Sequence, residues 1–303
     1  MNFQAYAGFV PGTYTDSLAP PVSTWWPWRG RTVHVARAAV PAAEVRAMVV
    51  HGGGGYSGAL WPAAAVAAGD GVDVLAPDLP LYGDTVEPDP AGVRYDAWVD
   101  LLCDLVAAER AADPRPLILF GASMGGMLAY EVAARTRQVA AVVATCLLDM
   151  SDPAARAAAT RFAWMGRPAP AVLRAVVPVF GRVRLPIRWL ADMAAMSTDP
   201  RLSRLCAADP RGGGASVPLA FLSSWMNYRH AAPEHFDAAP VTLVAPAADT
   251  WTAPELSIRF LQRISGPTEL VMLENCGHFP IEEPGLTQLR DAFTRVAERA
   301  ARR

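Results

Sequence analysis

Short apolar runs alternate with segments of helical periodicity along most of the chain. The runs expected to form buried strands span residues 45–50, 72–76, 117–120, 139–147, 241–245 and 269–273. Helices are expected over residues 60–68, 94–112, 124–135, 254–264 and 286–299. Residues 31–37 alternate apolar and polar side chains, which is the pattern of a half-exposed strand. This order predicts an α/β fold whose mostly parallel sheet is covered by helices on both faces.

The alternation stops between residues 150 and 237. In that segment, prolines and the glycine run 212–214 separate short helical patches that are rich in Trp, Met and Phe. We therefore expect one α/β core, formed by residues 1–149 and 238–303, that carries a helical insertion at residues 150–237. The first 25 residues mix Pro, Gly and aromatic side chains, and they predict an irregular arm packed on the core.

Charge and residue usage exclude several classes of function. The chain has 303 residues and a formal net charge of -2, so nothing indicates the basic patch that nucleic-acid binding requires. All 27 basic residues are arginines, which excludes a P-loop lysine and a lysine Schiff base. No feature of the sequence sets an oligomeric state.

The cysteines point to a reducing compartment. Cys103, Cys146, Cys206 and Cys276 lie far apart and form no Cys-x-x-Cys pair. This spacing favours neither a disulfide framework nor a zinc site, and it predicts a cytoplasmic protein. Residues 1–16 lack the basic and apolar parts of a signal peptide, and no apolar stretch reaches the roughly 20 residues of a membrane span.

The segment LILFGASMGG, residues 117–126, carries the strongest candidate for chemistry. Its residues 121–125 fit the pattern G-x-S-x-G between a predicted strand and a predicted helix. Such a turn places a serine hydroxyl at a helix N-terminus, where free N–H groups and the helix dipole favour negative charge. The flanking glycines let strand and helix approach closely. Ser123 is therefore predicted to be a nucleophile, with helix capping as the structural alternative.

A serine nucleophile needs a base that takes its proton, and five histidines are available. His278 lies in NCGHF, just after the last predicted strand, at the carboxyl edge where open parallel sheets form their sites. We predict that His278 is this base. His230, Glu234 and His235 lack the spacing of a helical zinc pair, so no metal site is expected there.

Two aspartates compete as the acid that orients the base. Asp249, in PAAD, follows the predicted strand 241–245, and the chain order Ser, Asp, His then matches that of known hydrolases. Asp149 lies before the insertion, with Asp152 and Pro153 close behind it. We predict Asp249 as the acid and keep Asp149 as the alternative, because Asp149 or Asp152 would also suit the cap of the first insertion helix.

The glycine run HGGGG, residues 51–55, is expected to complete an oxyanion hole. Acyl transfer needs two N–H donors aimed at the tetrahedral oxyanion, and the backbone N–H of Met124 is one of them. The second is predicted to come from Gly53, with Gly54 as the alternative. The run lacks the G-x-G-x-x-G spacing of a dinucleotide loop, so no nucleotide cofactor is expected.

The motifs HGGGG, APDLPLYGDT (residues 76–85), GASMGG, PAAD and NCGHF together resemble the α/β-hydrolase superfamily. The resemblance covers nearly the whole chain outside the insertion. It implies an eight-stranded, mostly parallel sheet, with the insertion after the sixth strand as a helical lid. It also implies a serine hydrolase of the esterase or monoacylglycerol-lipase type.

The expected reaction is cleavage of a carboxylic ester through an acyl-enzyme on Ser123, without cofactor or metal. The aromatic and Met side chains of the insertion favour an apolar acyl or aryl substrate as the small-molecule partner. The residues predicted to line its pocket are Tyr56, Trp164, Trp225, Met226 and Phe279. The same triad would also serve a carbon–carbon bond hydrolase of ring-cleavage products, or a thioesterase, lactonase or amidase. The non-enzymatic alternative is a ligand-binding protein with an idle triad.

Overall fold

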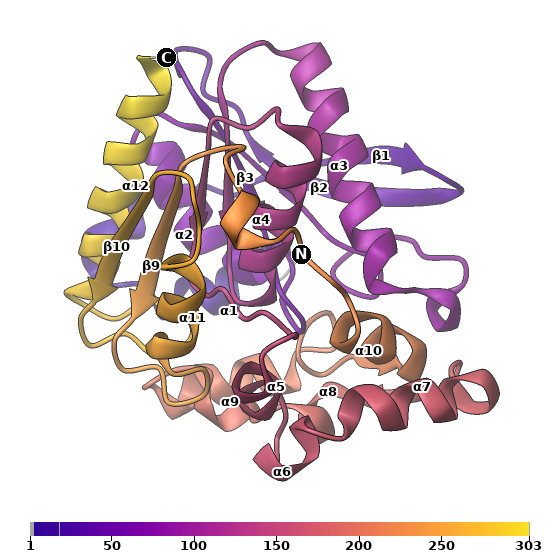
Figure 1. Cartoon of the computed structure of the whole chain (residues 1–303). Helices are drawn as coiled ribbons and strands as arrows, with labels where there is room; N and C mark the ends of the chain where they lie inside the picture. Colours follow the sequence, from indigo (N-terminus) through magenta and orange to yellow (C-terminus); the bar gives the residue numbers. More distant parts are fainter. Residues whose placement is uncertain (1–2, 18, 303) are drawn as a thin grey trace.

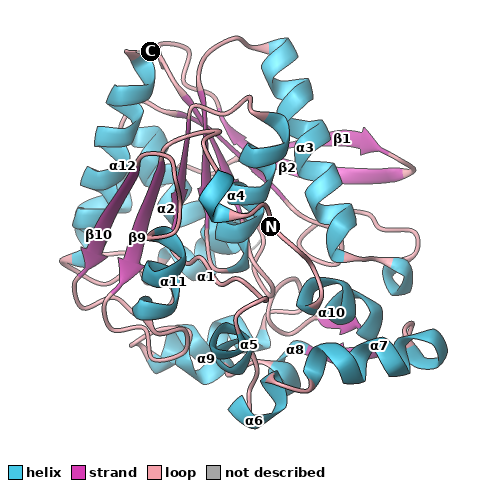
Figure 2. Ribbon diagram, in the orientation of Figure 1, coloured by secondary structure: helices cyan, strands magenta, loops and turns pink. Residues whose placement is uncertain are grey.

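An eight-stranded sheet forms the centre of the computed structural model, which describes residues 3–17 and 19–302 (Figure 2). Its strands are β1 (Val22–Trp28), β2 (Arg31–Ala38), β3 (Arg46–Val50), β4 (Asp73–Pro77), β5 (Leu117–Gly121), β6 (Ala141–Ala144), β9 (Val241–Pro246) and β10 (Thr268–Leu273). Their order across the sheet is β1-β2-β4-β3-β5-β6-β9-β10. β2 runs antiparallel to both β1 and β4, and all other pairs are parallel. The predicted mostly parallel sheet is confirmed.

Helices cover both faces of this sheet, as the alternating pattern predicts (Figure 1). The helices of the core are α2 (Ser57–Gly69), α3 (Tyr95–Ala112), α4 (Met124–Thr136), α11 (Pro254–Leu261) and α12 (Gly285–Ala301). Trp61 of α2 and Phe293 of α12 are buried in one hydrophobic cluster, whereas Trp98 of α3 and Tyr130 of α4 are buried in the other. Every residue of β3, β5, β6 and β9 is buried, because the sheet is covered on both sides.

The predicted strand at residues 139–147 is shorter in the structure, where β6 has only four residues. The N–H of Thr145 still donates to the carbonyl of Gly121 at 3.0 Å, but that of Leu147 donates to the hydroxyl of Ser257 at 2.8 Å. The chain therefore leaves the sheet after Ala144, although its apolar run continues.

The N-terminal arm packs on the core, as predicted, but the prediction that it is irregular is wrong. Residues in this region form the short helix α1 (Phe3–Ala7), a 3-10 turn (Gly12–Ser17) and the start of β1. Pro27 and the largely exposed side chains of β1 hid this strand from the sequence pattern. Proline is tolerated there because β1 is the edge strand of the sheet.

Between β6 and β9 the chain forms mostly short helices, which lie beyond the carboxyl ends of the central strands (Figure 1). They are α5 (Pro153–Ala159), α6 (Ala163–Gly166), α7 (Ala169–Phe180), α8 (Ile187–Leu190), α9 (Pro200–Ala208) and α10 (Leu219–Met226). Further 3-10 turns lie at Pro90–Gly92, Met193–Ala195 and Pro233–His235. A small antiparallel pair, β7 (Arg184–Pro186) with β8 (Ser216–Pro218), also lies in this segment and was not predicted. None of the described helices has the length and apolarity that crossing a bilayer demands.

Candidate active site

Ser123 occupies the turn between β5 and α4. Its φ of 56° is in the left-handed region, which a serine adopts only when its surroundings hold it there. A Cβ on Gly121 would lie 2.2 Å from the carbonyl oxygen of Gly125, so strand and helix meet too closely for any other residue. The N–H of Ser123 donates to the Thr145 hydroxyl at 2.9 Å, and its side chain forms no capping hydrogen bond with α4. The capping alternative for Ser123 is therefore not what the structure shows.

Ser123, His278 and Asp249 form one hydrogen-bonded chain. The Ser123 Oγ atom lies 2.8 Å from His278 Nε2, and His278 Nδ1 lies 2.8 Å from Asp249 Oδ2. Asp249 follows β9 and His278 follows β10, so both side chains come from loops at the carboxyl edge of the sheet. Both residues are buried. The structure thus brings together the three residues that the sequence singled out.

The carboxylate of Asp249 is held by more than the histidine. Its Oδ1 atom accepts the N–H groups of Trp251 and Thr252, each at 2.9 Å, and its Oδ2 accepts the Thr252 hydroxyl at 2.7 Å. Burial favours the protonated acid, but the bonds from His278 and Thr252 and the attraction of the imidazole outweigh it and lower the pKa of Asp249. An ionised Asp249 accepts a hydrogen bond from the N–H at His278 Nδ1, and this tautomer leaves the lone pair of Nε2 facing the Ser123 hydroxyl.

Asp149 lies outside this chain of hydrogen bonds. Its carboxylate accepts the N–H and the hydroxyl of Ser151 and contributes to a surface turn. Asp152 caps α5 by accepting the N–H of Ala154 at 2.8 Å. Of the two aspartates weighed as the acid, the geometry favours Asp249.

The glycine loop of residues 51–55 lies directly against the turn that carries Ser123. A Cβ on Gly52 would lie 2.9 Å from the backbone nitrogen of Met124. Met124 begins α4, so its N–H has no acceptor within the helix. The N–H of Gly54 faces the Tyr82 hydroxyl, where its hydrogen bond opposes the rise in the Tyr82 pKa that burial causes. This arrangement favours Gly53 over Gly54 as the second oxyanion donor.

His51 fixes the conformation of that loop. Its Nε2 accepts the N–H of Leu79 at 2.8 Å, so the proton is on Nδ1, which donates to the Gly52 carbonyl at 2.8 Å. Burial lowers the pKa of His51, which keeps the ring neutral and this tautomer in place. The Gly52 carbonyl also accepts the N–H of Gly55 at 3.1 Å, so both of its hydrogen bonds lie within the loop.

A family model described as "Alpha/beta hydrolase family" matches residues 47–287. The chain belongs to this family. The match includes the glycine loop, Ser123, Asp249 and His278. No curated protein matches the sequence.

Solved structures share the fold of this hydrolase at low sequence identity. A soluble variant of monoglyceride lipase from Saccharomyces cerevisiae is 15% identical, with a TM-score of 0.77 over 93% of this chain and 96% of the other. Paleococcus ferrophilus monoacylglycerol lipase is 20% identical, with a TM-score of 0.70 over 88% of this chain and 99% of the other. Est1E from Butyrivibrio proteoclasticus, solved with ferulic acid, is 15% identical, with a TM-score of 0.58 over 91% of this chain and 96% of the other. These likenesses confirm the fold.

Two cavities meet at Ser123 of the hydrolase. The first lies toward α1 and the glycine loop, and its walls include Tyr6, Leu60, Met196, His278 and Phe279. The second lies toward the insertion, and its walls include Met127, Ile187, Leu190, Phe221, Leu222 and Trp225. Both include Gly53, Ser123 and Trp251. Among the described residues that line them, none has an acidic side chain, a lysine or an arginine.

Only two of the five residues predicted for the substrate pocket line these cavities. Trp225 lines the second cavity and Phe279 the first. Tyr56 is fully buried behind the glycine loop, and Met226 packs against Met150 in a separate cluster. Trp164 is 75% exposed, because the short helix α6 carries it on the outside of the insertion.

Nothing in the sequence indicates that α1 contributes to the site. Tyr6 of α1 lines the first cavity and stacks on Phe279, with ring centroids 6.4 Å apart. Its hydroxyl donates to the buried carboxylate of Asp209 at 2.9 Å, and Tyr56 donates to the same oxygen at 2.8 Å. Asp209 ends α9, so these bonds join the N-terminal helix and the glycine loop to the insertion. No motif marks such a contact, because the partners lie 203 residues apart.

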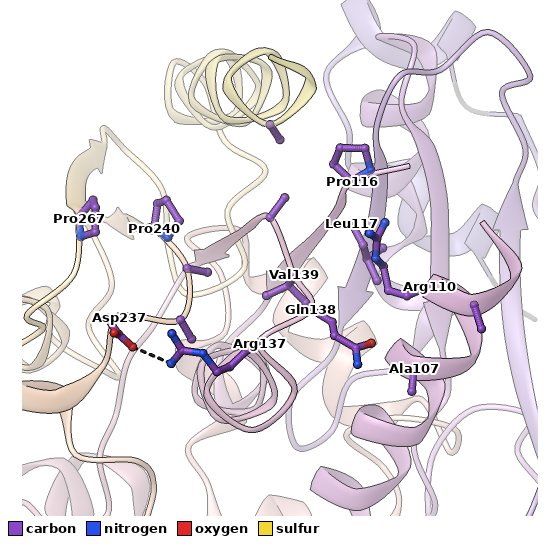
Figure 3. Close-up of a pocket in the computed structure, with 15 residues that line it drawn as sticks. Ala107, Arg110, Pro116, Leu117, Arg137, Gln138, Val139, Asp237, Pro240 and Pro267 are labelled. Carbon is purple, nitrogen blue, oxygen red and sulfur yellow. Dashed lines mark hydrogen bonds and ion pairs between the residues drawn. The ribbon is translucent and has the colours of Figure 1, made fainter. Parts of the chain in front are cut away.

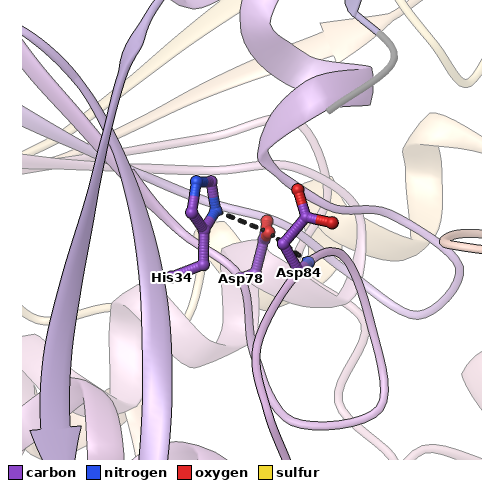
Figure 4. Close-up of side chains that lie close together, drawn as sticks. All are labelled: His34, Asp78 and Asp84. Carbon is purple, nitrogen blue, oxygen red and sulfur yellow. Dashed lines mark hydrogen bonds and ion pairs between the residues drawn. The ribbon is translucent and has the colours of Figure 1, made fainter.

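His34, Asp78 and Asp84 cluster beside β2 and β4 (Figure 4). His34 Nδ1 lies 2.8 Å from Asp78 Oδ2, which also accepts the N–H of Asp84 at 2.8 Å, while Oδ1 accepts the N–H of Ser57 at 2.6 Å. Both oxygens of Asp78 are thus committed to protein donors, which favours a structural role over metal binding. At the end of the insertion, His230 Nε2 lies 3.1 Å from the Tyr95 hydroxyl, and Glu234 pairs with Arg263 at 2.8 Å.

A wide, open hollow lies at the opposite edge of the sheet, at the amino ends of β5, β6 and β9 (Figure 3). Arg110, Gln138 and the ion pair of Arg137 with Asp237, at 2.7 Å, lie along it. None of the residues that line it was predicted to take part in the chemistry. Parallel sheets bind their ligands at the carboxyl edge, and the two cavities at Ser123 lie at that edge.

Proposed function

We propose that this hydrolase cleaves a carboxylic ester through an acyl-enzyme on Ser123. One observation carries the proposal: the Ser123 hydroxyl is 2.8 Å from His278 Nε2 at the point where two uncharged cavities meet. An ester has a group on each side of its carbonyl carbon, and the two cavities offer each group a place. Walls that hold no acidic residue, lysine or arginine favour uncharged, apolar groups on both sides.

In the proposed mechanism, His278 Nε2 takes the hydroxyl proton as Ser123 Oγ attacks the carbonyl carbon. Asp249 holds the ring and stabilises its positive charge. The N–H groups of Met124 and Gly53 bind the oxyanion of the tetrahedral intermediate. The intermediate collapses, the C–O bond breaks, and the alcohol leaves with the proton from His278. Water then attacks the acyl group with His278 as the base again, which frees the acid and Ser123.

The insertion acts in this proposal as a lid. Its residues Ile187, Leu190, Phe221 and Trp225 supply much of the wall of the second cavity. A tether joins it to the histidine loop, because the N–H of Phe279 donates to the Met196 carbonyl at 2.7 Å. The four free cysteines support a reducing compartment, and we propose the cytoplasm.

The test combines an active-site probe with a substrate series. Wild type and Ser123→Ala are treated with a fluorophosphonate and then with p-nitrophenyl esters of increasing acyl length, alongside matching thioesters. We expect the probe to label only wild type, and ester turnover to rise with acyl length until the second cavity is filled. An unlabelled wild type would overturn the proposal. Labelling without turnover of any ester or thioester would favour the carbon–carbon bond hydrolase.

A further inference from the structure

The outside of the insertion exposes an unusual number of apolar side chains. Thirteen large hydrophobic residues are exposed in the described parts of the chain, and eight of them fall between residues 162 and 189. These eight are Phe162, Trp164, Met165, Val172, Val179, Phe180, Val183 and Trp189, and we call the surface they form the outer face. The most exposed are Val179, at 77%, and Trp164, at 75%. Isolated exposed apolar residues need no explanation, but a concentration of them in one segment marks an interaction site.

The same segment has an extreme charge. Residues 153–191 contain seven arginines and no acidic residue, whereas all 29 acidic residues of the chain lie outside that segment. Among the seven, Arg182 pairs with Asp89 at 2.7 Å. Arg167, Arg174 and Arg188 are exposed on or beside α6, α7 and α8. The rest of the molecule therefore carries a net negative charge, and the positive charge is concentrated around the outer face.

Hydrogen bonds join the α6 and α8 parts of this face, and packing on α10 holds α7. The N–H of Arg161 donates to the Leu190 carbonyl at 2.7 Å, and its guanidinium donates to the Arg188 carbonyl at 2.6 Å. The start of α6 is thereby fixed beside α8. Helix α7 buries none of its own residues and packs on α10, so one side of it faces outward. In Figure 1, α6 and α7 lie along the edge of the molecule that is farthest from the sheet.

We propose that the outer face binds the surface of an anionic lipid bilayer. Exposed Trp, Phe and Val side chains flanked by arginines suit the boundary between acyl chains and anionic headgroups. The charge argues against a second copy of this chain as the partner, because two outer faces would bring arginines together. Bound in this way, the hydrolase would lie on the bilayer without spanning it.

The position of the face has a consequence for the site. Ile187 and Leu190 line the second cavity, while Arg188 and Trp189, between them in sequence, point outward. A bilayer on the outer face would therefore lie one helix away from the cavity at Ser123. This consequence rests on the proposed function, whereas binding to the bilayer does not.

The test is vesicle flotation with the full chain, using phosphatidylcholine vesicles with and without phosphatidylglycerol. Wild type is expected to float only with the anionic vesicles, and less so at high salt. Arg167→Gln/Arg174→Gln/Arg188→Gln should lower partitioning about a hundredfold, since each basic residue near an anionic surface contributes about fivefold. Trp164→Ser/Trp189→Ser should lower it on the order of tenfold.

Two controls carry changes of the same kind elsewhere on the surface, with one tryptophan in place of two. Trp25→Ser removes a tryptophan that is 52% exposed on β1, and Arg29→Gln/Arg295→Gln/Arg302→Gln removes three exposed arginines outside the insertion. Both should change partitioning by no more than about twofold, and thermal unfolding checks that every variant is folded. Fluorophosphonate labelling measures the proposed function separately from flotation.

Three results would overturn the proposal. The first is a wild type that floats with neither vesicle, or controls that lose as much binding as the outer-face variants. The second is a dimer in size-exclusion chromatography that Trp164→Ser/Trp189→Ser abolishes, which would make a second copy the partner. The third is tighter binding of a single-stranded oligonucleotide than of the anionic vesicles through the same arginines.

Discussion

Two regions of this molecule align a serine, a histidine and an aspartate. In the proposed active site, Ser123 Oγ lies 2.8 Å from His278 Nε2, and His278 Nδ1 lies 2.8 Å from Asp249. Beside β1 and β2, Ser23 Oγ lies 2.9 Å from His34 Nε2, whose Nδ1 lies 2.8 Å from Asp78. By hydrogen bonding alone, the two sets are nearly identical.

The surroundings of the two serines differ. Ser123 immediately precedes α4, with a φ of 56°, and lies beside the glycine loop and two cavities. Ser23 lies in the exposed edge strand β1, opposite Ala36 of β2, and lines neither of those cavities. A serine–histidine pair needs oxyanion donors and room for a carbonyl group before it can transfer an acyl group. Only the surroundings of Ser123 supply both.

The second set has a structural task that explains its form. Asp78 accepts the first N–H of α2, from Ser57, and ties the loop after β4 through Asp84. Gly83 lies so close that a Cβ there would come within 2.0 Å of the Asp78 carboxylate. His34 completes the shell of donors around a fully buried charge. The comparison teaches that such an alignment can serve stability as well as chemistry.

The strongest test of this comparison removes the hydroxyl of each serine in turn. Ser123→Ala should lower kcat/KM for a short p-nitrophenyl ester by about 10⁴- to 10⁶-fold, because the nucleophile is lost. Ser23→Ala should change it by no more than about twofold, since Ser23 faces no cavity at the site. Steady-state kinetics with fluorophosphonate labelling measure both. A comparable loss in Ser23→Ala would remove the distinction between the two regions.

Replacing an aspartate should give the next largest difference in activity. Asp249→Asn should lower kcat about 10⁴-fold, because the amide stabilises neither the required tautomer of His278 nor its charge. The fold should persist, as circular dichroism would show. The matched control is Asp149→Asn, which is expected to leave kcat within about twofold. Equal losses in the two variants would leave Asp249 unsupported as the acid.

Around Ser123, the sequence predicts the candidate catalytic residues better than it predicts the residues that line the cavities. Strand–turn–helix context, glycines and the ends of successive strands pointed to Ser123, Asp249 and His278, since local pattern and parallel topology determine where they lie. The walls depend on contacts between distant segments. Tyr6 meets Asp209 across 203 residues, and the orientation of α6, which exposes Trp164, follows from packing that no local pattern records.

Of the second region, the sequence predicts only the strand over residues 31–37, which carries His34. Pro27 and the exposed side chains of β1 obscured the strand, so Ser23 was assigned to an irregular arm and His34 had no visible partner. The pairing of β1 with β2 sets Trp25 opposite His34 and brings the Ser23 hydroxyl within reach of the ring. Antiparallel register of an edge strand is tertiary information that a run of Trp and Pro does not carry.

Asp78 should be more important to stability than Asp249 is. Asp78→Asn should lower the free energy of unfolding by about 3 kcal/mol, because a buried charge with satisfied donors is replaced by an amide that presents hydrogens to some of them. Burial acts to raise the pKa of Asp78, but the bonds from His34 and Asp84 and the charge of His34 outweigh it and lower that pKa. Urea unfolding of wild type and of Asp78→Asn measures this difference in the free energy of unfolding.

The difference in the free energy of unfolding between wild type and Asp78→Asn should depend on pH with a definite sign. A carboxyl whose pKa is lowered on folding stabilises the protein above its unfolded pKa of about 4, and this contribution fades as the pH falls through the folded value. The gap between wild type and Asp78→Asn should therefore be constant from pH 7 to about pH 5 and shrink below about pH 4. The exposed Asp291→Asn is the control. A gap that widened in acid would contradict the ionised, bonded Asp78.

The smallest effect should come from the hydroxyl of Tyr6. This hydroxyl joins α1 to the insertion, and it belongs to the region of Ser123 and not to that of Ser23. Tyr6→Phe keeps the ring on Phe279 and removes one of the two phenol donors to Asp209, so unfolding should become about 1 kcal/mol easier. Because Tyr6 lines the first cavity, KM should rise about threefold while kcat changes little, since the ring stays but the wall is held less firmly. Tyr14→Phe removes a phenol that bonds to Thr287 at 2.7 Å outside both cavities, and it should match the loss in stability without the change in KM. Equal KM values in the two variants would show that the tie to Asp209 supports only the fold.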